Sequence, residues 1–153
     1  MCSILEFCYA EILPMLDSTP ITVEFANEIN RLFMLGLAVY REARGEPFQG
    51  KLLVAQTIEN RVQDKRWPDN YVSVITQPWQ FSAFNKGDAN VTVFPKENDL
   101  AWTESLRAAA YVIYRDDKVT TANHYFAKSI PLPKWADLSK RVDEYGGHVF
   151  LEL

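Results

Sequence analysis

Residues 32–47 read LFMLGLAVYREARGEP, and this stretch decides the fold. Its first nine residues carry no charge. An apolar run of this kind, if helical, is buried on every side, and it is too short to cross a bilayer, which takes about 20 residues. We therefore expect a core helix over residues 27–43 that ends in a charged corner. The charged residues of this corner are Arg41, Glu42, Arg44 and Glu46.

A second helix is expected directly after the corner. Gly45 can take the left-handed conformation that ends a helix, and Pro47 suits the first position of the next one. The apolar positions of residues 48–62 recur at helical spacing, with Glu59 as a polar exception on or near the inner face. Gly36, inside the first helix, predicts close approach by another helix.

The two carboxylates of the corner meet opposite fields. Glu42 lies near the C-terminus of the first helix, where the helix dipole and burial both favour the neutral acid. Glu46 lies at the start of the next helix, where a carboxylate is favoured. Environments that differ in this way assign acid and base roles, so Glu42 is a candidate general acid/base. The alternative is that both carboxylates merely pair with Arg41 and Arg44 around a structural corner.

The composition is that of one globular domain. With 153 residues, 48% of them hydrophobic and 24% charged, the chain is expected to form a single domain over residues 1–153 with a sizeable core. The net charge is −4 and no basic stripe is present, which argues against nucleic acid as a partner. Aromatic residues, 13% of the chain, fill cores, and they also form the floors of sugar-binding clefts.

The N-terminal part is expected to carry no secretion signal. Cys2 and Cys8 have no further cysteine to pair with, which predicts free thiols and neither a disulfide framework nor a zinc site. A basic segment and a small-residue cleavage site are both lacking, so no signal peptide is expected. Residues 3–16 are expected to form a short amphipathic helix that packs on the body.

The middle of the chain alternates helices with polar loops. Residues 71–76 are expected to form a short helix and residues 98–115 a long, regular one. Residues 77–85 between them mix amides, a hydroxyl and three aromatic rings without a period. Such a mixture suits a polar, ring-shaped ligand such as a sugar, but composition alone favours a loop whose rings cover the core.

The C-terminal part has strand character. The β-rich segments are residues 119–126, 140–145 and 148–151. Gly146-Gly147 between the last two signals a hairpin. His124 and His148 fall in this small sheet, but no third ligand stands at a spacing suited to a metal. Each histidine is expected to be structural, and neither a metal nor another cofactor is expected.

Several motifs in order resemble the SleB/CwlJ-type cell-wall hydrolases, which include spore-cortex lytic enzymes and phage endolysins. The corner itself, YREARGEP over residues 40–47, resembles the family signature. Residues 1–26 lie outside the resemblance. Arg41 stands where the family usually has glycine, and Phe126 stands where a histidine is common. The resemblance covers about residues 35–150, through residues 50–61, 77–82, 122–125, 133–135 and 147–150.

The resemblance implies an α+β fold that is mostly helical, a lysozyme-like domain with a small antiparallel β lobe near the C-terminus. It implies cleavage of peptidoglycan between N-acetylmuramic acid and N-acetylglucosamine. The catalytic glutamate corresponds to Glu42, with Arg44 and Glu46 in support. The residues implied to line the substrate cleft are Gln80, Phe81, Ser82, Asn123, His124 and Tyr125.

The matched motifs favour a mechanism with one carboxylate. Two-carboxylate glycosidases place a second acid across the scissile bond, and no convincing second acid is found here. In a one-acid scheme Glu42 protonates the glycosidic oxygen and then, as a carboxylate, deprotonates the 6-hydroxyl of muramic acid, which leaves a 1,6-anhydro sugar. We therefore expect a lytic transglycosylase that needs no metal or cofactor.

Other activities remain as alternatives. One is a hydrolytic muramidase of the lysozyme type. Another is a non-catalytic wall-binding or virion structural domain. The departures from the family pattern at Arg41 and Phe126 support this alternative. A third, an enzyme that cleaves the muramoyl amide, commonly uses zinc, and its ligands are missing.

The resemblance further suggests a phage endolysin. We expect a monomer made in the host cytoplasm, released through a membrane pore, and active on the periplasmic cell wall of a Gram-negative host. Its expected partner is the peptidoglycan glycan strand, with no nucleic acid and no stable membrane insertion.

Overall fold

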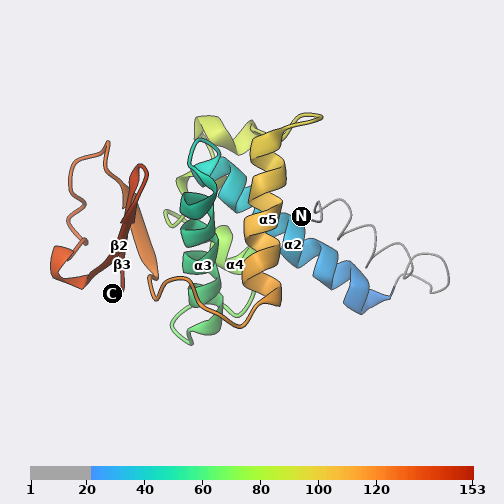
Figure 1. Ribbon diagram of the computed structural model, residues 1–153, viewed down its shortest axis with the longest axis horizontal. Helices are drawn as coiled ribbons and strands as arrows, with labels where there is room; N and C mark the ends of the chain where they lie inside the picture. The colour runs from blue at the N-terminus through green and yellow to red at the C-terminus, as the bar shows by residue number, and fades with distance from the viewer. Residues whose placement is uncertain (1–21) are drawn as a thin grey trace.

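The computed structural model describes residues 22–153. The helices are α2 (Val23–Ala43), α3 (Phe48–Gln63), α4 (Tyr71–Ile75) and α5 (Leu100–Tyr114), and short 3₁₀ helices are η1 (Ser82–Phe84), η2 (Ala89–Thr92) and η3 (Leu138–Lys140). The strands are β1 (His124–Ala127), β2 (Arg141–Tyr145) and β3 (His148–Leu151). Figure 1 shows the sheet at one end of the molecule, beside α3, with α5 and α2 beyond it. The helix expected at residues 3–16 and the two cysteines lie outside the described residues.

Helix α2 begins earlier than expected. It starts at Val23 because Thr22 caps it, with a side-chain oxygen that accepts the N–H of Phe25 at 3.2 Å. Residues 35–41 are buried on every side, as the apolar run predicts. Phe33 is 42% exposed, so the complete burial starts three residues later than the run itself.

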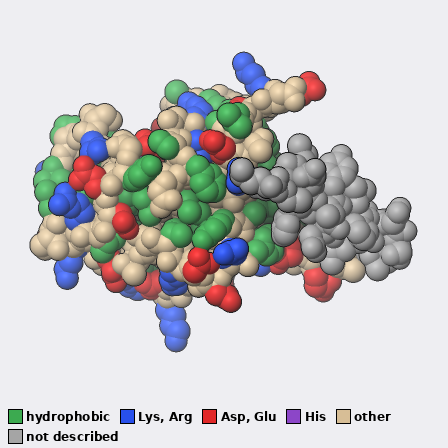
Figure 2. Space-filling model, in the orientation of Figure 1, with side chains coloured by type: hydrophobic (Ala, Val, Ile, Leu, Met, Phe, Trp, Pro, Cys, Tyr) green, Lys and Arg blue, Asp and Glu red, His purple; other side chains and the backbone are tan. Residues whose placement is uncertain are grey.

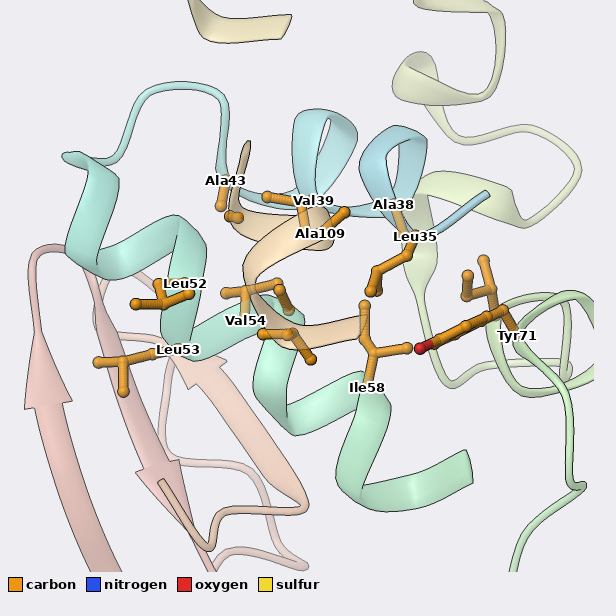
Figure 3. Packing of buried hydrophobic residues seen from close by; sticks show 14 of the residues in the cluster. Leu35, Ala38, Val39, Ala43, Leu52, Leu53, Val54, Ile58, Tyr71 and Ala109 are labelled. Carbon is orange, nitrogen blue, oxygen red and sulfur yellow. The ribbon is translucent and has the colours of Figure 1, made fainter. Parts of the chain in front are cut away.

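The main core forms where α2, α3 and α5 meet. Figure 3 shows Val39 of α2, Val54 of α3 and Ala109 of α5 pointing toward one another. The close approach predicted at Gly36 is confirmed, because a Cβ there would lie 2.8 Å from Leu106 of α5. These contacts fix the direction in which α2 leaves the core.

The corner between α2 and α3 is built without a left-handed residue. Arg44, the C-cap of α2, keeps right-handed helical dihedrals, and the N–H of Glu46 donates to the carbonyl of Ala43 at 2.9 Å. Gly45 has no positive φ, so the expected left-handed Gly45 is wrong. Pro47 precedes α3 as its N-cap, one position before the expected one.

The three strands form an antiparallel sheet in the order β1-β3-β2. Side chains alternate between the two faces of a sheet. Tyr125 and Phe150 face the helical core. Phe126, Val149 and Leu151 form a separate hydrophobic cluster on the other face. Both faces are therefore packed, and the face with Tyr125 is the one directed at the helices.

The predicted hairpin is confirmed, and the first strand is shorter than predicted. β2 and β3 flank the turn, in which Gly146 has a φ of 53°. β1 begins only at His124, and two carbonyls of the segment before it are bound by a side chain of α3. The amide of Asn60 donates to the carbonyls of Thr120 and Ala122 at 3.0 and 2.8 Å.

The predicted fold class is confirmed, since the chain is mostly helical with a small antiparallel sheet near its C-terminus. Figure 2 shows charged side chains of both signs toward the edges of one face and hydrophobic side chains over its middle. None of the helices within residues 22–153 is both long and apolar enough to cross a membrane.

Candidate active site

Glu42 lies in the last turn of α2, where three distant segments meet. Its Oε1 accepts the backbone N–H of Ala83 at 3.3 Å, and its Oε2 accepts the hydroxyl of Tyr125 at 3.1 Å. Ala83 belongs to η1 and Tyr125 to β1. The Glu42 side chain is half-buried, although the residues on either side of it are buried.

Burial raises the pKa of Glu42 above its ordinary value. The hydrogen bonds from Ala83 and Tyr125 favour the ionised form and oppose this rise, whereas the negative charge of Asp88 adds to it. Burial has the largest effect, so this carboxyl keeps its proton to a higher pH than an exposed glutamic acid. The direction is the one expected from the sequence. Burial, together with the charge of Glu42, also raises the pKa of Tyr125.

A hollow of about 370 Å³ opens beside Glu42. It is lined by Arg41, Glu42, Ala43, Arg44, Gly45, Glu46 and Asn90. Ala83 and Tyr125, which bind the carboxyl oxygens of Glu42, are not among these lining residues. A larger cavity of about 830 Å³ lies between the end of α3 and β2, and Glu42 is not among its lining residues.

Glu46, the second carboxylate of the corner, is held by the hairpin turn. Its two oxygens accept the N–H of Gly147 at 3.0 and 3.1 Å, and Oε1 lies 3.4 Å from Nδ1 of His148. A Cβ on Gly146 would lie 1.7 Å from Oε2 of Glu46, so glycine alone leaves room for the carboxylate. Glu46 therefore ties the corner that carries Glu42 to the sheet that carries Tyr125.

Arg41 anchors the loop beside Glu42. Its guanidinium donates to the carbonyls of Val91 and Val93 at 2.8 and 3.1 Å. It also lies over the rings of Phe84 and Phe94, 4.7 and 4.9 Å from their centroids. Burial lowers its pKa. The arginine at this position is therefore engaged in packing the loop, with its charge turned toward carbonyl oxygens.

Arg44 does not pair with either carboxylate. It donates to the side-chain oxygen of Asn90 at 2.9 Å and to the carbonyl of Arg41 at 3.2 Å. Within residues 22–153, no salt bridge joins Glu42 or Glu46 to an arginine. The alternative in which the corner is a purely structural ion-pair network is therefore wrong.

Of the three residues implied from the segment 80–82, one is buried. Phe81 is 2% exposed and packs beneath Tyr125, with 6.3 Å between ring centroids. Its implied place on the cleft surface is therefore wrong, because the aromatic ring belongs to the core. Gln80 is exposed and accepts from Arg61 at 3.0 Å, and Ser82 is exposed at the start of η1.

The alternation of β1 separates His124 from Tyr125. Tyr125 points to Glu42, whereas His124 lies on the opposite face between Trp67 and Trp135, at ring-centroid distances of 5.8 and 5.4 Å. Burial, with nearby arginine charges, lowers the pKa of His124 to about 4. His124 therefore does not join Tyr125 at Glu42, and its implied place in the substrate cleft stays a prediction.

Asn123 and Phe126 also lie away from Glu42. Asn123 is 5% exposed, and its side chain exchanges hydrogen bonds with the backbone of Leu153 at 2.8 and 2.9 Å. It lines the larger cavity and not the hollow beside Glu42, and its implied contact with substrate stays a prediction. Phe126 packs on Trp135 on the outer face of the sheet, which places this departure from the family pattern far from the carboxyl group.

Two buried cations were given no role by the sequence. Arg61 donates to the carbonyl of Asn123 at 2.5 Å and to Gln80, and burial lowers its pKa. Lys51, 2% exposed, donates to the carbonyl of Glu46 and pairs with Glu104 at 2.9 Å. Both lie on the buried surface of α3, so a charge within an apolar helix was the available signal.

His148 is buried but incompletely satisfied. Its Nδ1 makes no hydrogen bond within the described residues, although Glu46 lies near it. Its ring meets the edge of Tyr125 at 5.4 Å, and burial lowers its pKa. No group of three His, Cys, Asp or Glu residues in the described part of the chain is placed to hold a metal ion.

A known family model, described as Cell Wall Hydrolase, matches residues 45–151. The chain belongs to this family. The match begins three residues after Glu42. A curated member, the spore cortex-lytic enzyme of Halalkalibacterium halodurans, is 31% identical over 121 residues, which are 79% of this chain and 34% of that protein. The chain thus spans about a third of the length of this relative.

The fold is that of a SleB catalytic domain. The catalytic domain of SleB from Bacillus anthracis, described as a germination-specific lytic transglycosylase, superposes with a TM-score of 0.63 at 30% identity, covering 80% of this chain and 94% of that one. The catalytic domain of SleB from Bacillus cereus gives a TM-score of 0.60 at 29% identity, covering 80% and 90%. The lysozyme-like architecture expected from the sequence is confirmed.

Proposed function

We propose that this chain cleaves the glycan strand of peptidoglycan as a lytic transglycosylase, with Glu42 as the group that moves the proton. The observation that carries the proposal is a half-buried carboxyl with a raised pKa, on a residue that lines an open hollow. The family and the likeness to the SleB catalytic domain support the same activity.

The reaction needs only one carboxyl group. Glu42 in its neutral form donates its proton to the oxygen that joins N-acetylmuramic acid to the next sugar, and the bond from that oxygen to C1 breaks. The 6-hydroxyl oxygen of the same muramic acid then forms a bond to C1. Glu42, now a carboxylate, takes the hydroxyl proton. No water is consumed, and the acid is regenerated.

The partners of Glu42 suit both halves of this cycle. Burial favours the protonated acid that begins the reaction. The hydroxyl of Tyr125 and the N–H of Ala83 stabilise the carboxylate that forms in the first half. Glu46 is the other carboxylate that lines the hollow, and the hairpin turn already binds both of its oxygens. This favours a one-carboxylate scheme over a hydrolytic muramidase with a second acid.

The substitution Glu42→Gln tests the proposal. We expect it to lower the rate of solubilisation of isolated sacculi by at least about a thousandfold, without loss of stability, because the amide keeps the shape of the side chain. Turbidity clearing measures the rate, and thermal unfolding measures the fold. Near-normal clearing by the folded variant would remove Glu42 from the reaction. The masses of the products decide the chemistry, since reducing muramic ends would mean hydrolysis by water.

The non-catalytic alternative has lost its two supporting features. Arg41 turns its charge into the loop, and Phe126 packs on the outer face of the sheet. Arg41 lines the hollow beside Glu42, but its guanidinium is already bound to loop carbonyls. Protein that sediments with sacculi but releases no soluble sugar would favour this alternative.

We also propose that the chain acts as a monomeric endolysin, made in the cytoplasm of a Gram-negative host and released to the periplasmic wall. The support is the resemblance of its motifs to endolysins of this family. Expression in such a host should cause lysis only when a pore-forming membrane protein is produced with it. Lysis of equal speed without the pore would contradict this mode of release.

A further inference from the structure

The segment that leads to Ala83 begins with an unusual turn. The N–H of Gln80 donates to the carbonyl of Gln77 at 3.2 Å, which closes a four-residue turn with Pro78 second and Trp79 third. Trp79 has a φ of 67°. Turns with a left-handed third residue and proline in second place favour glycine at the third position. This chain instead places its bulkiest side-chain type there.

The backbone of Trp79 is therefore strained. Asn98, with a φ of 58°, is the other non-glycine residue with a positive φ within residues 22–153. Asparagine tolerates the left-handed region, whereas a bulky residue there is an outlier. Strain of this kind persists where function requires it, and an observed outlier is a starting point for a hypothesis about function.

The indole of Trp79 gains nothing from packing. Its side chain is 88% exposed, the largest value among the exposed large hydrophobic residues of the described part. The contact recorded for the residue is from its backbone N–H to the side-chain oxygen of Asn85, at 3.3 Å. A single exposed hydrophobic side chain is ordinary. Trp79 combines an exposed hydrophobic side chain with a strained backbone. Neither feature stabilises the fold.

The turn lies close to the candidate active site. Phe81 is fixed in the core, and the N–H of Ala83 binds Glu42. Ala83 stands four positions after Trp79, so their Cα atoms lie at most about 14 Å apart. The indole is thus within the reach of a few sugar rings from the carboxyl group.

We propose that Trp79 is a stacking platform for an N-acetylhexosamine ring of the glycan strand, a few rings from the bond that Glu42 cleaves. The inference rests on the proposed function. The apolar face of a pyranose ring matches the flat face of an indole. The exposed side chains of Gln80 and Ser82, on the same segment, add an amide and a hydroxyl for the polar edge of the sugar. Asn85 holds the turn so that the indole stays outside the core.

The substitution Trp79→Gly separates binding from folding. Glycine relieves the left-handed strain, so we expect the melting temperature to stay level or rise. Loss of the stacking face should weaken binding to isolated sacculi about five- to tenfold. Binding is measured by sedimentation of the full chain carrying Glu42→Gln, with and without Trp79→Gly, so that turnover does not destroy the sacculi. Asn98→Gly is the matched control, because it relieves the same backbone conformation and removes no ring.

Each outcome decides between the possibilities. Weaker binding with an unchanged or higher melting temperature supports the platform. Unchanged binding overturns it, and a lower melting temperature together with weaker binding overturns it in favour of a structural indole. If the wild-type chain cleaves sacculi and Trp79→Gly binds and cleaves them equally well, the inference alone fails. If the protein neither binds nor cleaves sacculi, the proposed function fails with it.

Discussion

Two carboxylates stand on either side of one corner and have opposite surroundings. Glu42 accepts one hydrogen bond per oxygen, from partners 41 and 83 residues away in sequence. Glu46 accepts the same backbone N–H with both oxygens and lies beside a buried histidine. The comparison shows how a short stretch of chain produces one reactive acid and one structural one.

The surroundings of the two carboxylates differ because one lies inside a helix and the other lies in the connection between two helices. Glu42 is part of α2, whose C-terminal dipole disfavours a carboxylate and whose packing buries it. Glu46 stands in the connection before α3, and the sheet supplies a donor directly to it. The first carboxyl can therefore bind and release a proton during a reaction. The second is engaged in holding the corner against the hairpin.

The largest effect expected from this comparison concerns Glu46. We expect Glu46→Ala to lower the free energy of unfolding by about 2 kcal/mol, because the half-buried N–H of Gly147 loses its acceptor. Cleavage by the fraction that remains folded should stay within a few-fold of the wild type. Urea denaturation measures the stability, and clearing of sacculi at low temperature measures the activity.

The control for Glu46 is Glu144→Gln. Glu144 is exposed and forms surface ion pairs with Lys128 and Arg141, so its loss should change the stability by less than about 0.5 kcal/mol. If the Glu46 variant were fully folded yet inactive, Glu46 would take part in the chemistry. The mechanism would then be one of two carboxylates, and the contrast drawn here would fail.

Local patterns in the sequence were sufficient for most of the fold. The apolar run of α2, the spacing in α3 and α5 and the Gly146-Gly147 hairpin each predict an element that is present. The wrong predictions concern the ends of helices, where a capping side chain or a single hydrogen bond decides which residue comes last. Thr22 extends α2 backward, and the corner closes without a left-handed Gly45. At both helix ends the sequence pattern is compatible with more than one backbone conformation, so it does not predict which one forms.

The candidate site was predictable in its centre but not in its surroundings. Glu42 could be found because a charge follows a long apolar helix, and that pattern is local. The resemblance implied that consecutive residues of a motif all line the cleft. Adjacent residues of a strand face opposite ways, however, and this separates His124 from Tyr125. The N–H of Ala83 carries no side-chain signal at all. Phe81 shows that an aromatic residue in a polar segment can still belong to the core.

The smaller effect concerns Tyr125, whose hydroxyl keeps Glu42 from being a still weaker acid. Tyr125→Phe retains the ring that packs on Phe150 and Phe81 and removes one hydrogen bond to the carboxylate. This bond lowers the pKa of Glu42, so its loss raises that pKa further. The acid then stays protonated to a higher pH. We expect the alkaline limb of the pH–rate profile to move upward.

The maximal rate of Tyr125→Phe should nevertheless fall about fivefold, because the carboxylate formed during the reaction loses a donor worth about 1 kcal/mol. Rates of sacculus solubilisation across pH measure both changes. Tyr111→Phe is the matched control, since its hydroxyl donates to the exposed Asp117 and should alter neither. A limb that moves downward would mean that the Tyr125 hydroxyl favours the protonated form of Glu42. The acid would then depend on Tyr125 as well as on burial, and the corner alone would not explain its reactivity.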